Sequence, residues 1–223
     1  MRGRRVAISD FVSLAASPDP QLDELALALA AEFGPVTEAE AMARLDELGD
    51  ELAAQASGHT PEEEVAACRE VLGVRHGFEG DHEQYDRPEN SMLDSVLVRR
   101  RGLPILLSVI YVEAARRAGM ELAGVGLPGH FVAGHFGVEP PLLVDPFSGG
   151  TALTVEAPAP LVRPWGPHET ALRMLNNLAA AYERRGDLGR TITAARLRLA
   201  LPLGPDARGE LASELLSLEA RLN

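Results

Sequence analysis

A histidine and an aspartate lie on two neighbouring segments that are expected to be strands. His130 lies within GVGLPGHFVAG (residues 124–134), and Asp145 lies within LLVDPFSGG (residues 142–150). A histidine oriented by a carboxylate is the general-base half of a nucleophilic catalytic site. His130 and Asp145 are therefore the candidate catalytic pair. A structural histidine–carboxylate pair is the alternative interpretation.

Three further polar side chains are expected near the same cleft and are candidates for ligand binding: Asn90, Tyr111 and Glu113. Asn90 could instead cap a turn or satisfy backbone groups. Glu113 lies within an apolar helix, where an unpaired charge is costly. It must therefore either pair with an arginine such as Arg116 or face the cleft.

Cysteine and histidine chemistry elsewhere in the chain is limited. Cys68 is the single cysteine, so no intramolecular disulfide can form, and its place on the apolar side of a helix favours a buried thiol over a nucleophile. His130 and His135 are five residues apart, which points them to opposite faces of a regular strand. His76 and His82 flank an acidic loop without a recognised ligand spacing. The sequence predicts no metal site and no cofactor.

Composition restricts the classes of partner. Hydrophobic residues make up 46% of the 223 residues, enough for a sizeable core. Acidic residues outnumber basic ones, 33 against 21, for a formal net charge of −12. This charge repels phosphate backbones and anionic lipids, so neither nucleic acid nor a membrane is an expected partner. Asp10 interrupts the first apolar run and no stretch has the length of a membrane span, so we expect no secretory signal and a cytoplasmic location.

Residues 1–72 are expected to form a helical N-terminal region. LDELALALAAEF has apolar residues at helical spacing and ends at a Gly-Pro pair. A second helix is predicted after Thr37, with Glu40 three residues on in a capping-box pattern. A third is predicted from the Thr-Pro pair of TPEEE through VAACREVLG.

Residues 73–160 are expected to form the core. HGFEGDHEQYDRPENS is typical of an irregular loop, and Ser91 could cap a short helix, MLDSVLVRR. A strongly apolar, buried helix is predicted to follow Pro104. LAGVGL, HFVAGHFG and LLVDPF have the composition of strands in a small antiparallel sheet, and TALTVE is a further candidate strand.

Residues 161–223 are expected to form a helical tail. Two helices separated by Gly186-Asp187 resemble one tetratricopeptide unit, and GELASELLSLEARL would cap it. One such unit cannot bury its own apolar face, so it should dock on the core or offer a face to a protein partner. The predicted fold class is α+β.

Four short motifs resemble the SirB-type branch of the transglutaminase-like family, whose wording is N-S-x-L, R-R-x-G-[IL]-P-[IL], P-G-H-F and D-P-F-x-G. The chain carries them in that order, at Asn90–Leu93, in RRRGLPI ending at Ile105, at Pro128–Phe131 and at Asp145–Gly149. The helical N-terminal region and the tail also match this branch, so the resemblance covers nearly the whole chain.

The resemblance implies a papain-like core, in which a cysteine opens a buried helix and a histidine and an aspartate follow on adjacent strands. His130 and Asp145 take the histidine and aspartate positions, and Pro104 stands at the position of the cysteine. Proline offers no nucleophile, and Ser108, about 6 Å further along the helix, is not expected to replace it. Relatives carry a basic residue where this chain has Ala133-Gly134, so any anion contact made there is not carried over.

The expected function is a non-catalytic binding module whose cleft holds a peptide, a protein segment or a small ligand. One alternative is an enzyme of altered mechanism, in which His130 and Asp145 act as a general-base dyad for amide hydrolysis or acyl transfer. A second alternative is a structural or assembly protein that acts through its acidic helices.

Overall fold

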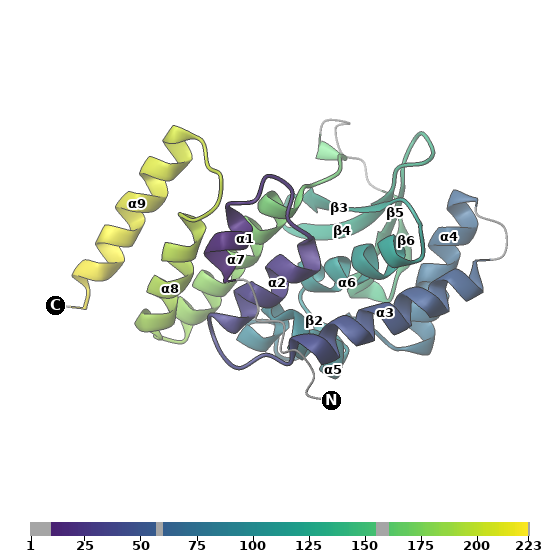
Figure 1. Ribbon diagram of the computed structural model, residues 1–223, viewed down its shortest axis with the longest axis horizontal. Coiled ribbons are helices and arrows are strands. Elements are labelled where there is room, and N and C mark those ends of the chain that lie inside the picture. The colour runs from purple at the N-terminus through teal and green to yellow at the C-terminus, as the bar shows by residue number, and fades with distance from the viewer. Residues whose placement is uncertain (1–9, 57–59, 155–160, 223) are drawn as a thin grey trace, which may run out of the picture.

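Helix α6 (Pro104–Arg117) lies between a four-stranded sheet and the N-terminal helices (Figure 1). The computed structural model describes residues 10–56, 60–154 and 161–222. Every α6 residue from Pro104 to Ala115 is buried except Val112, which confirms the predicted buried helix. Neither α6 nor any other helix in these ranges has both the length and the apolar character needed to cross a membrane.

The N-terminal region is helical, as predicted. Its helices are α1 (Phe11–Ala15), α2 (Leu22–Ala31), α3 (Glu38–Gln55) and α4 (Pro61–Cys68). Helix α4 begins with a complete capping box between Thr60 and Glu63. The capping box predicted for α3 is wrong. Thr37 occupies the N-cap position but its side chain accepts no hydrogen bond, because its backbone (φ −96°, ψ 75°) is not in the extended conformation typical of a capping residue.

The third predicted helix continues beyond α4 as a π-helix, η1 (Arg69–Arg75), which the sequence did not indicate. Gly73 in η1 lies directly against the loop that precedes the last strand. A Cβ atom added to Gly73 would stand 2.0 Å from the carbonyl oxygen of Gly149, so this close approach requires glycine. π-Helical turns often lie beside functional sites.

The segment predicted as an irregular loop and short helix contains more regular structure than expected. Its elements are β1 (Glu79–Gly80), the 3₁₀-helix η2 (Pro88–Ser91), α5 (Leu93–Arg99) and β2 (Arg101–Gly102), with β1 and β2 paired in parallel. Ser91 does not cap α5, contrary to the prediction. It closes η2 instead, and Met92 takes the N-cap position without a side-chain hydrogen bond.

The sheet is antiparallel with the order β3-β4-β5-β6. Its strands are β3 (Leu122–Leu127), β4 (His130–His135), β5 (Leu142–Asp145) and β6 (Thr151–Leu153). The 3₁₀-helix η3 (Pro146–Ser148) comes directly after β5. Each strand lies in a segment that the sequence predicted as a strand. Helix α6 packs against β3 and β4. The sheet therefore fixes the start of β4 and the end of β5 relative to the start of α6.

The tail is helical and lies at one end of the molecule, with its last helix outermost (Figure 1). Its helices are α7 (Pro167–Arg184), α8 (Leu188–Arg198) and α9 (Pro205–Ala220). One buried hydrophobic cluster extends from Phe11 through α6 to Leu201. The three regions that we distinguish, residues 1–72, 73–160 and 161–223, therefore share a core, and this division remains a proposal.

A cluster of buried charges joins α6 to α2 and α3. Arg117 donates to Asp23 at 2.6 Å, to Asp46 at 2.6 Å and to Glu113 at 3.0 Å. Arg116 also bonds Glu113 and Asp23. Burial and the nearby Asp23 carboxylate raise the pKa of Glu113 to about 7. Of the two alternatives for Glu113, the structure shows pairing with arginines.

Replacing Arg117 by alanine is expected to lower the free energy of unfolding by about 3 kcal/mol, because two buried carboxylates lose their best-ordered partner. Urea unfolding measures this change. The matched control is Arg196→Ala on the tail, which removes an exposed salt bridge and should cost less than about 1 kcal/mol. Equal losses in the two variants would contradict a structural role for the buried cluster.

Candidate functional site

The two candidate catalytic residues meet at one edge of the sheet. His130 is the first residue of β4 and Asp145 is the last residue of β5. His130 Nε2 lies 3.0 Å from Asp145 Oδ1, and the two side chains are 29% and 11% exposed. The imidazole therefore keeps access to solvent while the carboxylate is largely enclosed.

Asp145 is held in place by the turn that follows it. Its Oδ1 accepts a hydrogen bond from the Phe147 amide at 3.0 Å, and its Oδ2 accepts one from Ser148 Oγ at 2.8 Å. Burial opposes ionisation of Asp145, but these two groups and the His130 imidazole outweigh it and lower its pKa below the usual value. An ionised carboxylate favours a proton on the facing Nε2, which leaves Nδ1 of a neutral His130 as the free acceptor. No residue in the described ranges bonds this Nδ1.

Neither the first turn of α6 nor Cys68 offers an accessible nucleophile. Pro104 is buried as the first residue of α6. The Ser108 hydroxyl donates to the Pro104 carbonyl at 2.9 Å, so it is used within the helix. Cys68 is also buried, and burial together with nearby Glu64 raises its thiol pKa to about 12. Since the thiolate is the reactive form, Cys68 is inert near neutral pH.

An aromatic wall, formed by His82, Tyr85 and Phe147, stands beside His130. Phe147 is its centre, with ring centroids 4.6 Å from His82, 5.9 Å from Tyr85 and 6.3 Å from His130. All these pairs meet edge to face, the geometry that aromatic quadrupoles favour. Tyr85 and Phe147 are functional candidates that the sequence did not reveal, although the D-P-F-x-G motif, which contains Phe147, was a usable signal.

Arg173 of α7 binds the backbone of the turn that precedes His130. Its guanidinium donates to the carbonyl oxygens of Leu127 and His130 and lies over the rings of Phe131 and Trp165. These contacts fix the β3–β4 turn from the tail. Nothing in the local sequence around Arg173 signals its contact with the turn, because Leu127 and His130 lie more than forty residues away.

Asn90 organises the loop on the other side of the site. Its amide nitrogen donates to the Gln84 carbonyl at 2.7 Å, and its amide oxygen accepts from Arg99 at 2.7 Å. Its backbone carbonyl accepts from Leu103, the residue before Pro104. Arg99 also pairs with Asp81 at 2.8 Å. Asn90 thereby ties the loop to the start of α6, which is the backbone-satisfying role considered from the sequence.

The three residues predicted to bind a ligand are not exposed to solvent. Asn90, Tyr111 and Glu113 are all buried. The Tyr111 hydroxyl has no hydrogen-bond partner in the described structure and lies against Gly73 and Gly150, and burial raises its pKa. Their positions favour structural roles, and the exposed polar group beside the aromatic wall is His130.

Two other histidines are each matched with one carboxylate. His76 Nε2 bonds Glu51 at 2.9 Å, and His135 Nε2 bonds Glu64 at 2.7 Å. Within residues 10–56, 60–154 and 161–222, no three His, Cys, Asp or Glu side chains are grouped so that they could hold a metal ion.

This arrangement agrees with the comparison to known families. A model described as the Transglutaminase-like superfamily matches residues 39–190, which include α6, the sheet and α7. The chain belongs to the transglutaminase-like superfamily. In this chain the His130 and Asp145 side chains lie 3.0 Å apart, and α6 begins with Pro104.

Its relatives are bacterial and eukaryotic. The chain is 36% identical over 177 residues to a UPF0162 protein of Xylella fastidiosa, covering 70% of this chain and 63% of that protein. It is 32% identical over 180 residues to a UPF0162 protein of Pseudomonas aeruginosa, covering 78% of this chain and 62% of that protein. It is 30% identical over 177 residues to human F-box only protein 21, covering 70% of this chain and 27% of that protein.

The transglutaminase-like chain thus spans less than two thirds of the length of the UPF0162 proteins that it resembles. No solved structure gives a significant match.

Replacing Asn90 by alanine is expected to destabilise the protein by about 2 kcal/mol, because it removes a buried amide together with its hydrogen bonds to the Gln84 carbonyl and from the Arg99 guanidinium. Thermal and urea unfolding check this loss. Asn177→Ala, at a half-buried position on α7, is the matched control and should change stability by less than about 0.5 kcal/mol. An Asn90 variant as stable as the control would show that the loop is held by other contacts.

The lowered pKa of Asp145 predicts a specific pH dependence. A carboxyl whose pKa is lowered by folding stabilises the protein above its unfolded pKa, and this contribution is lost as the pH falls through the folded pKa. The stability difference between wild type and Asp145→Asn should therefore be full at neutral pH and shrink below about pH 4. Unfolding measured from pH 7 downwards checks this, with Asp206→Asn on exposed α9 as control. A difference that stays constant with pH would contradict an ionised, hydrogen-bonded Asp145.

Proposed function

We propose that the chain is a non-catalytic binding module that uses the inherited transglutaminase-like cleft to hold an extended peptide or a small ligand. The observation that supports this proposal is Pro104 at the start of α6, where the family resemblance places the nucleophile, with the Ser108 hydroxyl bonded within the helix and Cys68 buried. Acyl transfer through a covalent thioester requires a thiolate at that position.

The environment of His130 supports a binding role. The aromatic wall supplies apolar contact area, and His130 adds a partly exposed acceptor whose orientation Asp145 fixes. Ligand sites commonly combine apolar walls with a few well-oriented polar groups. Arg173 and Asn90 hold the two sides of this site, so little ordering would be required on binding.

The relatives are consistent with a module. A stretch of 177 residues matches about a quarter of a protein named F-box only protein 21, so a similar sequence occurs within a longer chain. We further propose that the chain belongs to the SirB-type branch and acts in the cytoplasm. We also propose that α7 and α8 form a tetratricopeptide-like unit that offers a face to a protein partner.

A peptide and small-metabolite library screened against the purified chain by ligand-observed NMR tests the cleft. The strongest ligand is expected to bind Phe147→Ala about tenfold more weakly, because Phe147 is the centre of the aromatic wall. Leu216→Ala, an exposed position on α9, is the control and should bind as wild type does. The ligand should be recovered unchanged. Binding that is indifferent to Phe147→Ala would refute the cleft as the binding site.

One observation favours a second candidate, an enzyme of altered mechanism. His130 presents Nε2 to Asp145 and has a free Nδ1, the arrangement of a general base that could activate water or an amine without a covalent intermediate. Mass spectrometry of the bound ligand distinguishes the two functions. Hydrolysis or acyl transfer that disappears in His130→Ala would replace the binding-module proposal with this one.

A further inference from the structure

The two edges of the sheet differ. The β3 edge is covered where the Trp165 amide donates to the Gly124 carbonyl at 2.8 Å. Strand β6 forms the other edge, and in the described residues it pairs only with β5. Thr151 and Ala152 are exposed. Such an edge presents unpaired backbone donors and acceptors, which can pair with another extended chain.

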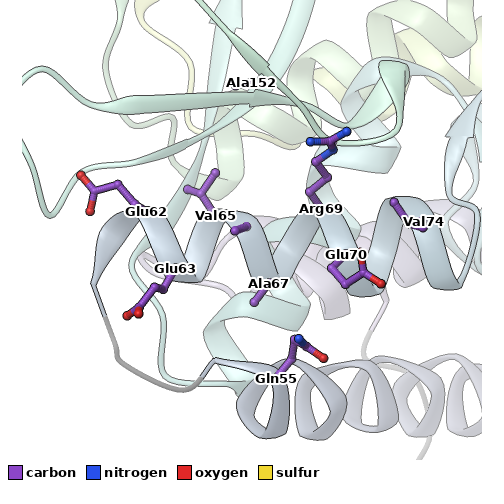
Figure 2. A pocket seen from close by; sticks show the side chains of 11 residues that line it. Gln55, Glu62, Glu63, Val65, Ala67, Arg69, Glu70, Val74 and Ala152 are labelled. Atoms are coloured by element: carbon purple, nitrogen blue, oxygen red, sulfur yellow. The ribbon is translucent and has the colours of Figure 1, made fainter.

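A trough runs along this open edge. It has a volume of about 630 Å³, and the small side chains of Ala66 and Ala67 on α4 line it together with Gly150 and Ala152. Figure 2 shows α4 and η1 crossing beneath the strand that carries Ala152, with the end of α3 on the opposite side. Val65 and Arg69 rise toward that strand, and Glu63 and Glu70 point toward α3 (Figure 2). An added strand would therefore have a backbone partner on one side and a helix beneath it.

The charges around the trough indicate the charge of the segment that it would bind. Its lining carries three carboxylates, from Glu62, Glu63 and Glu70, and one guanidinium, from Arg69. Glu63 is used in the capping box of α4, whereas Glu62 and Glu70 are exposed and form no ion pair in the described structure. Two unpaired carboxylates in the lining of the trough favour a segment with basic side chains.

We propose that this trough binds an extended, basic peptide segment of a partner protein, which adds to β6 as a fifth strand of the sheet. Main-chain hydrogen bonds to β6 would supply affinity, and the carboxylates of Glu62 and Glu70 would select lysine and arginine side chains. The trough shares no lining residue with the aromatic wall or with His130 and Asp145. This inference therefore does not rest on the function proposed for the cleft.

A blocked synthetic peptide of alternating lysine and valine is the probe, with alternating glutamate and valine as its matched control. Fluorescence anisotropy should detect binding of the basic peptide alone. Double substitution Glu62→Gln with Glu70→Gln should weaken binding about fivefold, because two exposed charge pairs are lost. Asp206→Asn with Glu210→Gln on α9 removes the same charge elsewhere and should leave binding unchanged.

Strand addition also predicts a second effect, which is specific to backbone pairing. Two versions of the basic peptide are compared, one with its odd-numbered amides N-methylated and one with its even-numbered amides N-methylated. Only one version should bind about tenfold more weakly, because only one edge of an extended chain pairs with β6. Hydrogen exchange should show new protection at Thr151–Leu153. Equal binding of the acidic peptide, an effect of the α9 substitutions equal to that of the trough substitutions, or protection that maps elsewhere would each overturn the proposal. So would equal binding of the two methylated versions, or no measurable binding.

Discussion

Burial of α6 is the constraint on which the remaining structure depends. The sheet covers the helix on one side and α2 and α3 cover it on another, so its polar groups must find partners within the protein. Ser108 bonds the carbonyl one turn back, and Glu113 is matched by two arginines. The Tyr111 hydroxyl is the exception, held without a partner against two glycines. The charge cluster around Arg117 is therefore a consequence of enclosing the helix. It contributes to the stability of the folded protein because each buried carboxylate in it has a cationic partner.

The same enclosed helix sets the chemistry of the site. Its first turn, where a thiol enzyme places a nucleophile and where the helix dipole would stabilise a thiolate, carries a proline ring. The antiparallel sheet still brings the histidine and aspartate together beside this turn. The histidine and aspartate are thus paired while the first turn of α6 carries no nucleophilic side chain, and this combination is the basis of the binding role that we propose.

One turn links the two surfaces that we propose to bind partners. The residues after β5 hold Asp145 through Phe147 and Ser148, and Phe147 forms the centre of the aromatic wall. The turn then passes Gly149 and Gly150 against the π-helix before β6 begins. The π-helix therefore packs against this turn and also lines the trough. A ligand at either surface would act on this shared turn, although the lining residues differ.

The sequence by itself determined the main helices and the four strands of the antiparallel sheet. Helical and strand periodicities, the glycine–proline breaks and the position of Pro104 are properties of neighbouring residues, so α6, the strands and the His130–Asp145 pair could be predicted. Capping at Thr37 and Ser91 was predicted wrongly because a cap depends on the backbone dihedrals of one residue, which distant packing sets. Only the tertiary structure decided the π-helix, the arginine partners of Glu113 and the contact of Arg173 with the β3–β4 turn. The physical reason is that these features join segments far apart in the chain, and their energy comes from burial and shape complementarity that no local pattern encodes.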